Sequence, residues 1–126
     1  MNTFIAVACG GAFGAMSRYG LNTIMTQKIA STFPFGTFTI NILGSLVMGI
    51  CFALITTLWD GSQALKAFLI VGFFGSFTTF STFSLDTVQL IERQSYGEAF
   101  FYMFGTVLFS VGGLFLGLIL TRQMIA

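Results

Sequence analysis

The sequence AFLIVGFFGSFTTFSTFSLDTVQLI, which forms residues 67–91, indicates a helix that crosses a membrane. Its first part, residues 67–85, is a run of 19 residues without a charge. A helix needs about 20 mainly apolar residues to cross a bilayer. Near the centre lie Gly72, Gly75 and a dense group of hydroxyl residues: Ser76, Thr78, Thr79, Ser81, Thr82 and Ser84. The stretch therefore combines the length of a membrane span with a polar middle.

Similar windows lie on either side of this stretch. Residues 29–59 and 99–121 form charge-free runs of 31 and 23 residues, and residues 1–17 are also mainly apolar. These windows predict four transmembrane helices, at about residues 3–21, 37–58, 67–91 and 99–120. Because little sequence is left over, we expect a single all-α membrane domain over residues 1–126.

The composition supports this class and argues against an enzyme. Of the 126 residues, 56% are hydrophobic and 7% are charged, whereas a soluble domain carries about 25% charged residues. The chain has no His, and three of its four acids lie near predicted span ends. A zinc site, a His-based nucleophile or a pair of catalytic carboxylates therefore lacks the residues it needs. Cys9 and Cys51 fall inside apolar spans, where a thiol behaves as a small hydrophobe.

Two glycine pairs predict close contacts between helices. Gly10 and Gly14 in the first span, and Gly113 and Gly117 in the fourth, have the small-x-x-x-small spacing of tightly packed membrane helices. We expect both spans to pack through these residues.

The positive charges leave the orientation in the membrane open. Cytoplasmic loops normally carry an excess of Lys and Arg. With four spans, Lys66 and Arg122 lie on one side, while Lys28, Arg93 and also Arg18 belong to the other. Such a balance permits insertion in both orientations and an antiparallel dimer of opposed copies. A weakly biased single orientation is the equal alternative.

Polar residues form stripes on three of the spans. Thr37, Asn41 and Ser45 share a face of the second, and Tyr102, Thr106 and Ser110 share a face of the fourth. Ser and Thr often only join membrane helices. Asn41 needs a partner or a solute, because an unpaired amide in a membrane costs several kcal/mol. Hydroxyls and an amide without an acid favour a small anion over a cation.

Phe80 and Phe83 are candidates for direct contact with such an anion. They lie among the hydroxyl residues of the third span, three positions apart. The edge of an aromatic ring is electropositive, so it contacts an anion without trapping it. The alternative is that both rings face lipid or fill the core.

Three motifs make the sequence resemble the Fluc-type (CrcB-like) family of small fluoride channels. They are GGAFGAMSRY at residues 10–19, PFGTFTINILGS at 34–45 and GFFGSFTTFSTF at 72–83. Ser76 stands where many relatives are expected to have Gly, and residues 23–33 match no family pattern.

The resemblance implies a dual-topology homodimer in the inner (plasma) membrane, with two pores that pass fluoride passively out of the cell. Its expected partners are fluoride, a second copy of the chain and the lipid bilayer, with no nucleic acid. It also implies a fluoride pathway lined by Asn41, Phe80, Phe83, Ser81, Thr82, Ser84, Tyr102, Thr106 and Ser110. Arg18 resembles a first-helix Arg of the family and is a candidate for the vestibule, the alternative being an interfacial cation.

The resemblance further implies that the third helix is broken near its centre. There the backbone carbonyls of Gly75 and Thr78, from both subunits, would hold a structural sodium ion. Unwound backbone at membrane depth is tolerated when it is buried in protein, and its free carbonyls suit a small cation.

Two other functions would share the size and the polar stripes. A proton-coupled exporter of cationic drugs needs a carboxylate inside the membrane, and Asp86 is the only acid within a predicted span. A non-transporting assembly subunit would use the stripes for packing alone. Flux measurements separate the three.

Overall fold

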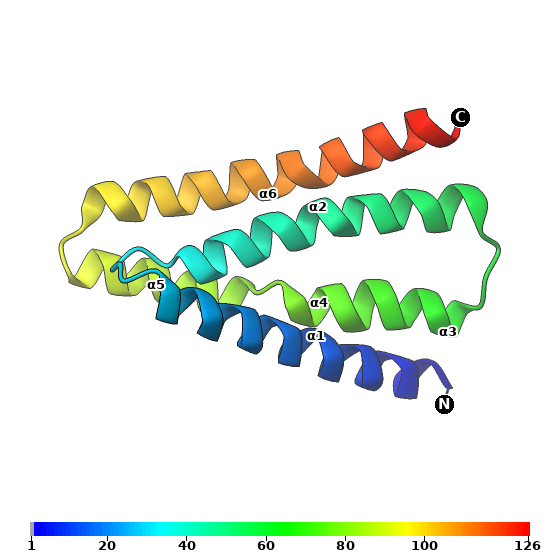
Figure 1. Cartoon of the computed structure of the whole chain (residues 1–126), viewed down its shortest axis with the longest axis horizontal. Coiled ribbons are helices and arrows are strands. Elements are labelled where there is room, and N and C mark those ends of the chain that lie inside the picture. The colour runs from blue at the N-terminus through cyan, green and yellow to red at the C-terminus, as the bar shows by residue number, and fades with distance from the viewer. Residues whose placement is uncertain (1) are drawn as a thin grey trace.

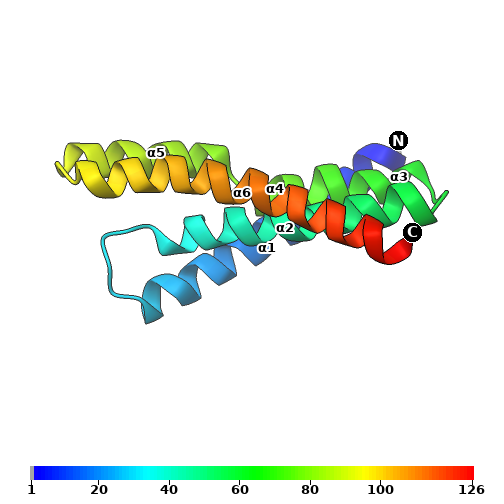
Figure 2. The same cartoon turned by 90° about the horizontal axis from the view of Figure 1, so that it is seen from above.

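The computed structural model describes residues 2–126, all of whose secondary structure is helical. Its elements are α1 (Asn2–Lys28), α2 (Phe35–Leu58), α3 (Gln63–Lys66), the π-helical segment η1 (Ala67–Phe74), α4 (Gly75–Phe77), α5 (Phe80–Glu92) and α6 (Tyr96–Ile125). They run roughly along one long axis, and both termini lie at the same end (Figure 1). At the opposite end, α1 and α2 diverge from the α5–α6 pair (Figure 2).

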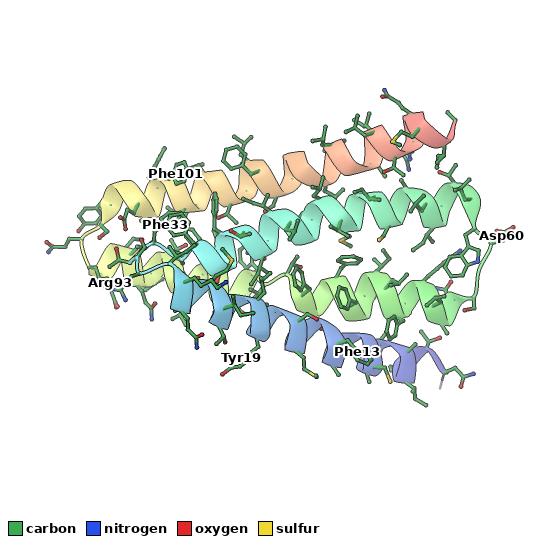
Figure 3. The ribbon with its side chains drawn as sticks, viewed as in Figure 1. Phe13, Tyr19, Phe33, Asp60, Arg93 and Phe101 are labelled. Atoms are coloured by element: carbon green, nitrogen blue, oxygen red, sulfur yellow. The ribbon has the colours of Figure 1, made fainter. Side chains whose placement is uncertain are left out.

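Within residues 2–126, three stretches are long and apolar enough to cross a membrane, namely residues 35–58, 63–92 and 96–125. The first helix, α1, is less apolar because Ser17, Arg18 and Asn22 lie in its second half. It runs beyond the predicted end near residue 21, since the first strong helix breaker after it is Pro34. Asp60 and Arg93 lie at opposite ends of the molecule (Figure 3). The predicted all-α membrane fold with four long helices is confirmed.

Glycines allow the helices to approach closely. A Cβ at Gly10 or Gly14 of α1 would collide with a backbone carbonyl of η1, at Phe68 or Phe73 respectively. In the α2–α6 pair, a Cβ at Gly117 would collide with the Leu46 carbonyl. The predicted role of Gly10, Gly14 and Gly117 as packing residues is confirmed.

Gly113 differs from its partner Gly117. A Cβ there would lie 3.6 Å from the Ile42 carbonyl, which is an ordinary contact. On α2, Gly49 makes the second close approach, because its Cβ would collide with the Leu114 carbonyl. The α2–α6 contact therefore uses one glycine from each helix.

The third span is interrupted, as expected. Residues 67–74 form the π-helix η1, a feature not anticipated from the sequence, and the helix ends at Phe77. Thr78 (φ −81°, ψ 157°) and Thr79 (φ −149°, ψ 126°) are extended, and α5 begins at Phe80. The break falls about halfway along the molecule (Figure 1). At the break, backbone polar groups leave the hydrogen-bond pattern of the helix.

Candidate functional site

Asn41 of α2 holds the break through both polar atoms of its amide. Its Nδ2 donates to the Thr79 carbonyl at 3.0 Å, and its Oδ1 accepts from the Thr79 N–H at 2.8 Å. The partner that the sequence required for Asn41 is therefore the backbone of the third helix. One Nδ2 hydrogen remains outside this pair, since an amide carries two.

The break also deprives two carbonyls of their helical donors. In an unbroken α-helix the N–H groups of residues 79 and 82 would donate to the carbonyls of residues 75 and 78. Here the Thr79 N–H donates to Asn41, and the Thr82 N–H donates to Thr79 Oγ1 at 3.2 Å. The Gly75 and Thr78 carbonyls thus lose the donors that a continuous helix would give them.

A cavity of about 260 Å³ adjoins the break, and we call it the central cavity. It lies between α2, the third span and α6, and its lining residues are Asn41, Ser45, Thr78, Thr79, Phe80, Phe83, Thr106, Val107, Ser110 and Val111. None of these residues is charged. Predicted site residues from three separate stretches of sequence therefore meet here.

Thr106 and Ser110 differ from a group of helical hydroxyl residues that are satisfied by their own helix. The hydroxyls of this group donate to the carbonyl four residues earlier, at 2.8–2.9 Å; its members are Thr23, Thr56, Thr78, Ser84 and Thr87. Thr106 Oγ1 and Ser110 Oγ are buried but have no hydrogen-bond partner within residues 2–126. Thr106 is only 5% exposed. Leaving such a group unpaired costs about 1–3 kcal/mol, so both hydroxyls are available to a ligand in the central cavity.

Phe80 and Phe83 lie together but in different environments. Their ring centroids are 5.6 Å apart. Phe83 is 9% exposed and packs on the Tyr102 ring at 5.2 Å, whereas Phe80 is 77% exposed. Phe83 belongs to the core of the chain, and Phe80 presents its ring outward.

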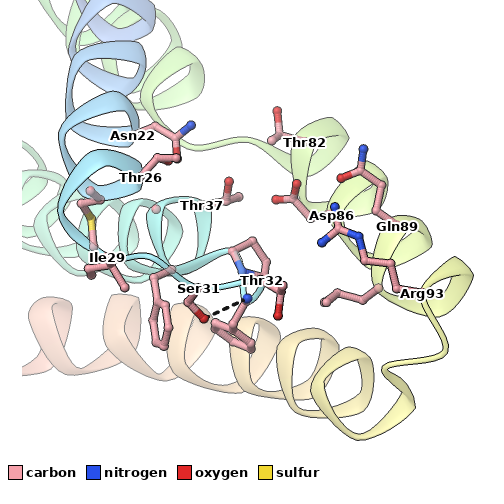
Figure 4. Close-up of a pocket in the computed structure, with 16 residues that line it drawn as sticks. Asn22, Thr26, Ile29, Ser31, Thr32, Thr37, Thr82, Asp86, Gln89 and Arg93 are labelled. Atoms are coloured by element: carbon pink, nitrogen blue, oxygen red, sulfur yellow. Dashed lines mark hydrogen bonds between the residues drawn. The ribbon is translucent and has the colours of Figure 1, made fainter.

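A second cavity, of about 470 Å³, lies where the C-terminal parts of α1 and α5 face the start of α2 (Figure 4). We call it the polar cavity. Hydroxyl and amide side chains from all three helices and from the connection between α1 and α2 surround it: Asn22, Thr26, Ser31, Thr32, Thr37, Thr82 and Gln89. Its charged lining residues, within the part of the chain that the structure describes, are Asp86 and Arg93.

Asp86 pairs with Tyr102. Its Oδ2 accepts a hydrogen bond from the Tyr102 hydroxyl at 2.9 Å, and Tyr102 is completely buried. No role for Asp86 follows from the charge and polarity patterns of the sequence, although its place relative to the α5–α6 turn carries a signal. Both residues lie eight positions from Gln94 in the turn between α5 and α6. Residues equally distant from the turn of an antiparallel helical hairpin lie at the same level.

The hydroxyl residues at the start of α5 differ in whether they line a cavity. Thr82 lines the polar cavity, whereas Ser81 and Ser84 line neither cavity. Ser84 Oγ donates to the Phe80 carbonyl at 2.9 Å, and Ser81 Oγ lies 3.3 Å from Thr79 Oγ1. Within one chain these two hydroxyls serve local structure.

Arg18 also lines neither of the two cavities. Its Nε donates to the Ser76 carbonyl at 3.0 Å, just before the break. A place for Arg18 in a vestibule stays a prediction.

Long apolar helices, a span broken near its centre, a cavity at the break and a polar cavity beyond it fit a small multi-pass membrane channel. The family model described as CrcB-like protein, Camphor Resistance (CrcB), matches residues 5–118. The chain therefore belongs to the CrcB family.

Relatives of similar length match the whole chain or nearly all of it. A protein of Rhodospirillum centenum is 43% identical over 126 residues, which cover all of both chains. One of Nitrobacter winogradskyi is 47% identical over 121 residues, covering 95% of this chain and 96% of the relative. A third, from Caulobacter vibrioides, is 37% identical over the full length of both chains. Each of these relatives is named a fluoride-specific ion channel FluC.

Proposed function

We propose that this chain is a fluoride-specific ion channel, as its relatives are named, and that fluoride passes through the central cavity. The observation that carries the site assignment is the pair of unpartnered hydroxyls, Thr106 and Ser110. Fluoride is a small, strong hydrogen-bond acceptor, and these hydroxyls have donors to give. Because the chain belongs to a family of channels, the alternatives of a cation exporter, an assembly subunit and an enzyme are excluded.

The direction of α5 supports an anion in this place. The N-terminus of a helix carries a partial positive charge from its aligned peptide dipoles. The α5 helix begins at Phe80, and Phe80 lines the central cavity. The broken span therefore turns a positive helix end toward the cavity in the middle of the membrane.

The polar residues on one face of α2 extend from the polar cavity to the central cavity. Thr37 lines the polar cavity, while Asn41 and Ser45 lie on the same helix face and line the central cavity. We place the aqueous access to the pathway at the polar cavity. From there the ion passes along α2 to Asn41, between Phe83 and the hydroxyls of α6.

Tyr102 takes part in this pathway if its hydroxyl changes its hydrogen-bond acceptor from Asp86 to the ion. Its single hydroxyl hydrogen is held by Asp86. An anion bound at Tyr102 must take that hydrogen bond in place of the carboxylate. Asp86 thus keeps the buried hydroxyl satisfied while no ion is present, and Arg93 in the same cavity offsets its negative charge.

A second copy of the chain would complete the pathway. Phe80 is 77% exposed although it lines the central cavity, and Gly75 next to the break is exposed as well. An antiparallel dimer that covers this face would enclose Phe80 and bring two breaks together. The balanced distribution of Lys and Arg suits the two orientations that such a dimer needs.

Between the two breaks, backbone carbonyls fit a structural sodium ion. Gly75 and Thr78 have lost their helical donors to Asn41 and Thr79, so their carbonyl oxygens are available. Carbonyl oxygens are hard ligands of the kind that sodium accepts, and two copies would supply four of them. Bound there, the cation would neutralise negative helix ends and hold the subunits together.

Flux through liposomes tests the proposed function. Purified protein should release fluoride from loaded vesicles once a potassium ionophore removes the electrical limit, with chloride-loaded and protein-free vesicles as controls. Chloride release at the fluoride rate, or no fluoride release from correctly assembled protein, would overturn it.

A further inference from the structure

Arg18 bonds to backbone that the break has exposed. Ser76 lies in the last turn before the break, where helix carbonyls lack partners in their own helix. The Nε of Arg18 donates to the Ser76 carbonyl at 3.0 Å, and the bond is partly buried. The two helices are close at this point, since a Cβ on Gly11 of α1 would lie 3.2 Å from Ser76 Oγ.

We propose that Arg18 is a positioning residue for the broken span: its Nε–H holds the Ser76 peptide and so orients the adjoining Gly75 carbonyl toward the cation. This inference rests on the sodium site proposed above. Arg18 acts on the N-terminal side of the break, as Asn41 acts through Thr79 on the C-terminal side. Two neighbouring helices thus hold the two ends of the extended segment.

The bond has a further effect, because it removes one oxygen from the set that a cation can reach. The Ser76 carbonyl follows Gly75 directly and would compete with it as a ligand if it were free. A carbonyl oxygen that accepts this hydrogen bond has one lone pair fewer to offer a cation. Arg18 therefore influences which carbonyls face the cation without touching it.

The covalent structure of the side chains provides a sharp test. In Arg18→Gln the amide Nε2 is attached to Cδ, where Arg carries Nε, so the donor is kept and the charge is lost. In Arg18→Lys the charge is kept, but the nitrogen lies one atom further along the chain. The same two substitutions at Arg122, an exposed residue in the last turn of α6, are matched controls.

The main readout is the thermal stability of the dimer in detergent as sodium replaces N-methylglucamine, with fluoride flux measured separately. We expect Arg18→Gln to respond to sodium as the wild type does. Arg18→Lys should need about tenfold more sodium for half of the stabilisation, because it loses the hydrogen bond donated from the Nε position. Both Arg122 variants should match the wild type.

Other results would overturn the proposal. A Lys variant that behaves as the wild type while the Gln variant fails would mean that charge matters, as for a vestibule cation. Equal behaviour of the two variants would exclude the donor position as the cause. If the wild-type dimer does not respond to sodium, the cation site and this role both fall, whereas normal fluoride flux would leave the channel function standing.

A second measurement covers a Lys variant that gives little dimer. Hydrogen exchange of the backbone amides of residues 77–80 should be faster in Arg18→Lys than in Arg18→Gln. Equal exchange in the two proteins would contradict the proposal.

Discussion

Two buried threonines differ in whether their hydroxyl has a hydrogen-bond partner, and only the one without a partner is proposed to line the fluoride pathway. Thr106 and Thr87 are both buried threonines, but only the Thr87 hydroxyl has a partner, the Phe83 carbonyl at 2.8 Å. The difference gives a matched pair of isosteric substitutions.

Thr106→Val should lower fluoride flux by about tenfold, because one hydrogen bond to an anion is lost. The free energy of unfolding should stay constant or rise by about 1 kcal/mol, since an unpaired buried hydroxyl is removed. Thr87→Val should keep its flux. Liposome flux and thermal unfolding measure the two effects separately, and wild-type flux in Thr106→Val would remove this hydroxyl from the pathway.

Substitutions of Phe80 and Phe83 should likewise differ in their effects on flux and on stability. Phe83→Ile should lose flux and about 1–2 kcal/mol of stability, because its ring packs against Tyr102 in the core. Phe80→Ile should lose flux while the fold of the single chain is kept, because the Phe80 ring is largely exposed within one chain and would be enclosed only by the proposed second copy. Normal flux in both variants would mean that the hydroxyls of α6 carry the ion without the rings.

At the scale of whole elements, α1 offers two glycines in different surroundings. A Cβ at Gly14 would collide with the Phe73 carbonyl, whereas nothing lies within 4 Å of a Cβ at Gly20. Gly14→Ala should therefore destabilise the protein by about 1–3 kcal/mol by forcing α1 away from η1. Gly20→Ala should be neutral or stabilise the helix by up to about 1 kcal/mol. Thermal unfolding decides, and equal melting temperatures would show that α1 can shift at no cost.

Helices and their contacts differ in how far the sequence predicts them. Charge-free windows gave the long helices, and the spacing of Gly10 and Gly14 gave a true contact, because both signals are local. Asn41 bonds to Thr79 across 38 positions in the chain, and no local pattern encodes such a pair. The π-helix η1 packs closely against α1, and no local pattern in the sequence indicated it.

The assembly as a whole is tested by labelling from the two sides of the membrane. A version without Cys9 and Cys51 that carries Ala126→Cys has one thiol at the exposed C-terminus. For an antiparallel dimer, an impermeant maleimide should label about half of the protein from each side. Labelling from one side only would exclude dual topology, and labelling after detergent lysis provides the total.

The two hydrogen bonds of the Asn41 amide determine which substitutions position 41 can tolerate. The amide donates to the carbonyl of Thr79 and accepts from the N–H of the same residue, so both bonds depend on the length of the side chain. Asp has no N–H group to donate, Ser has one polar side-chain atom in place of two, and Gln is one carbon longer. In a library of all substitutions selected for growth in fluoride, position 41 should therefore tolerate almost no replacement. Its intolerance would follow from the architecture of the broken span, whether or not the ion ever touches the amide.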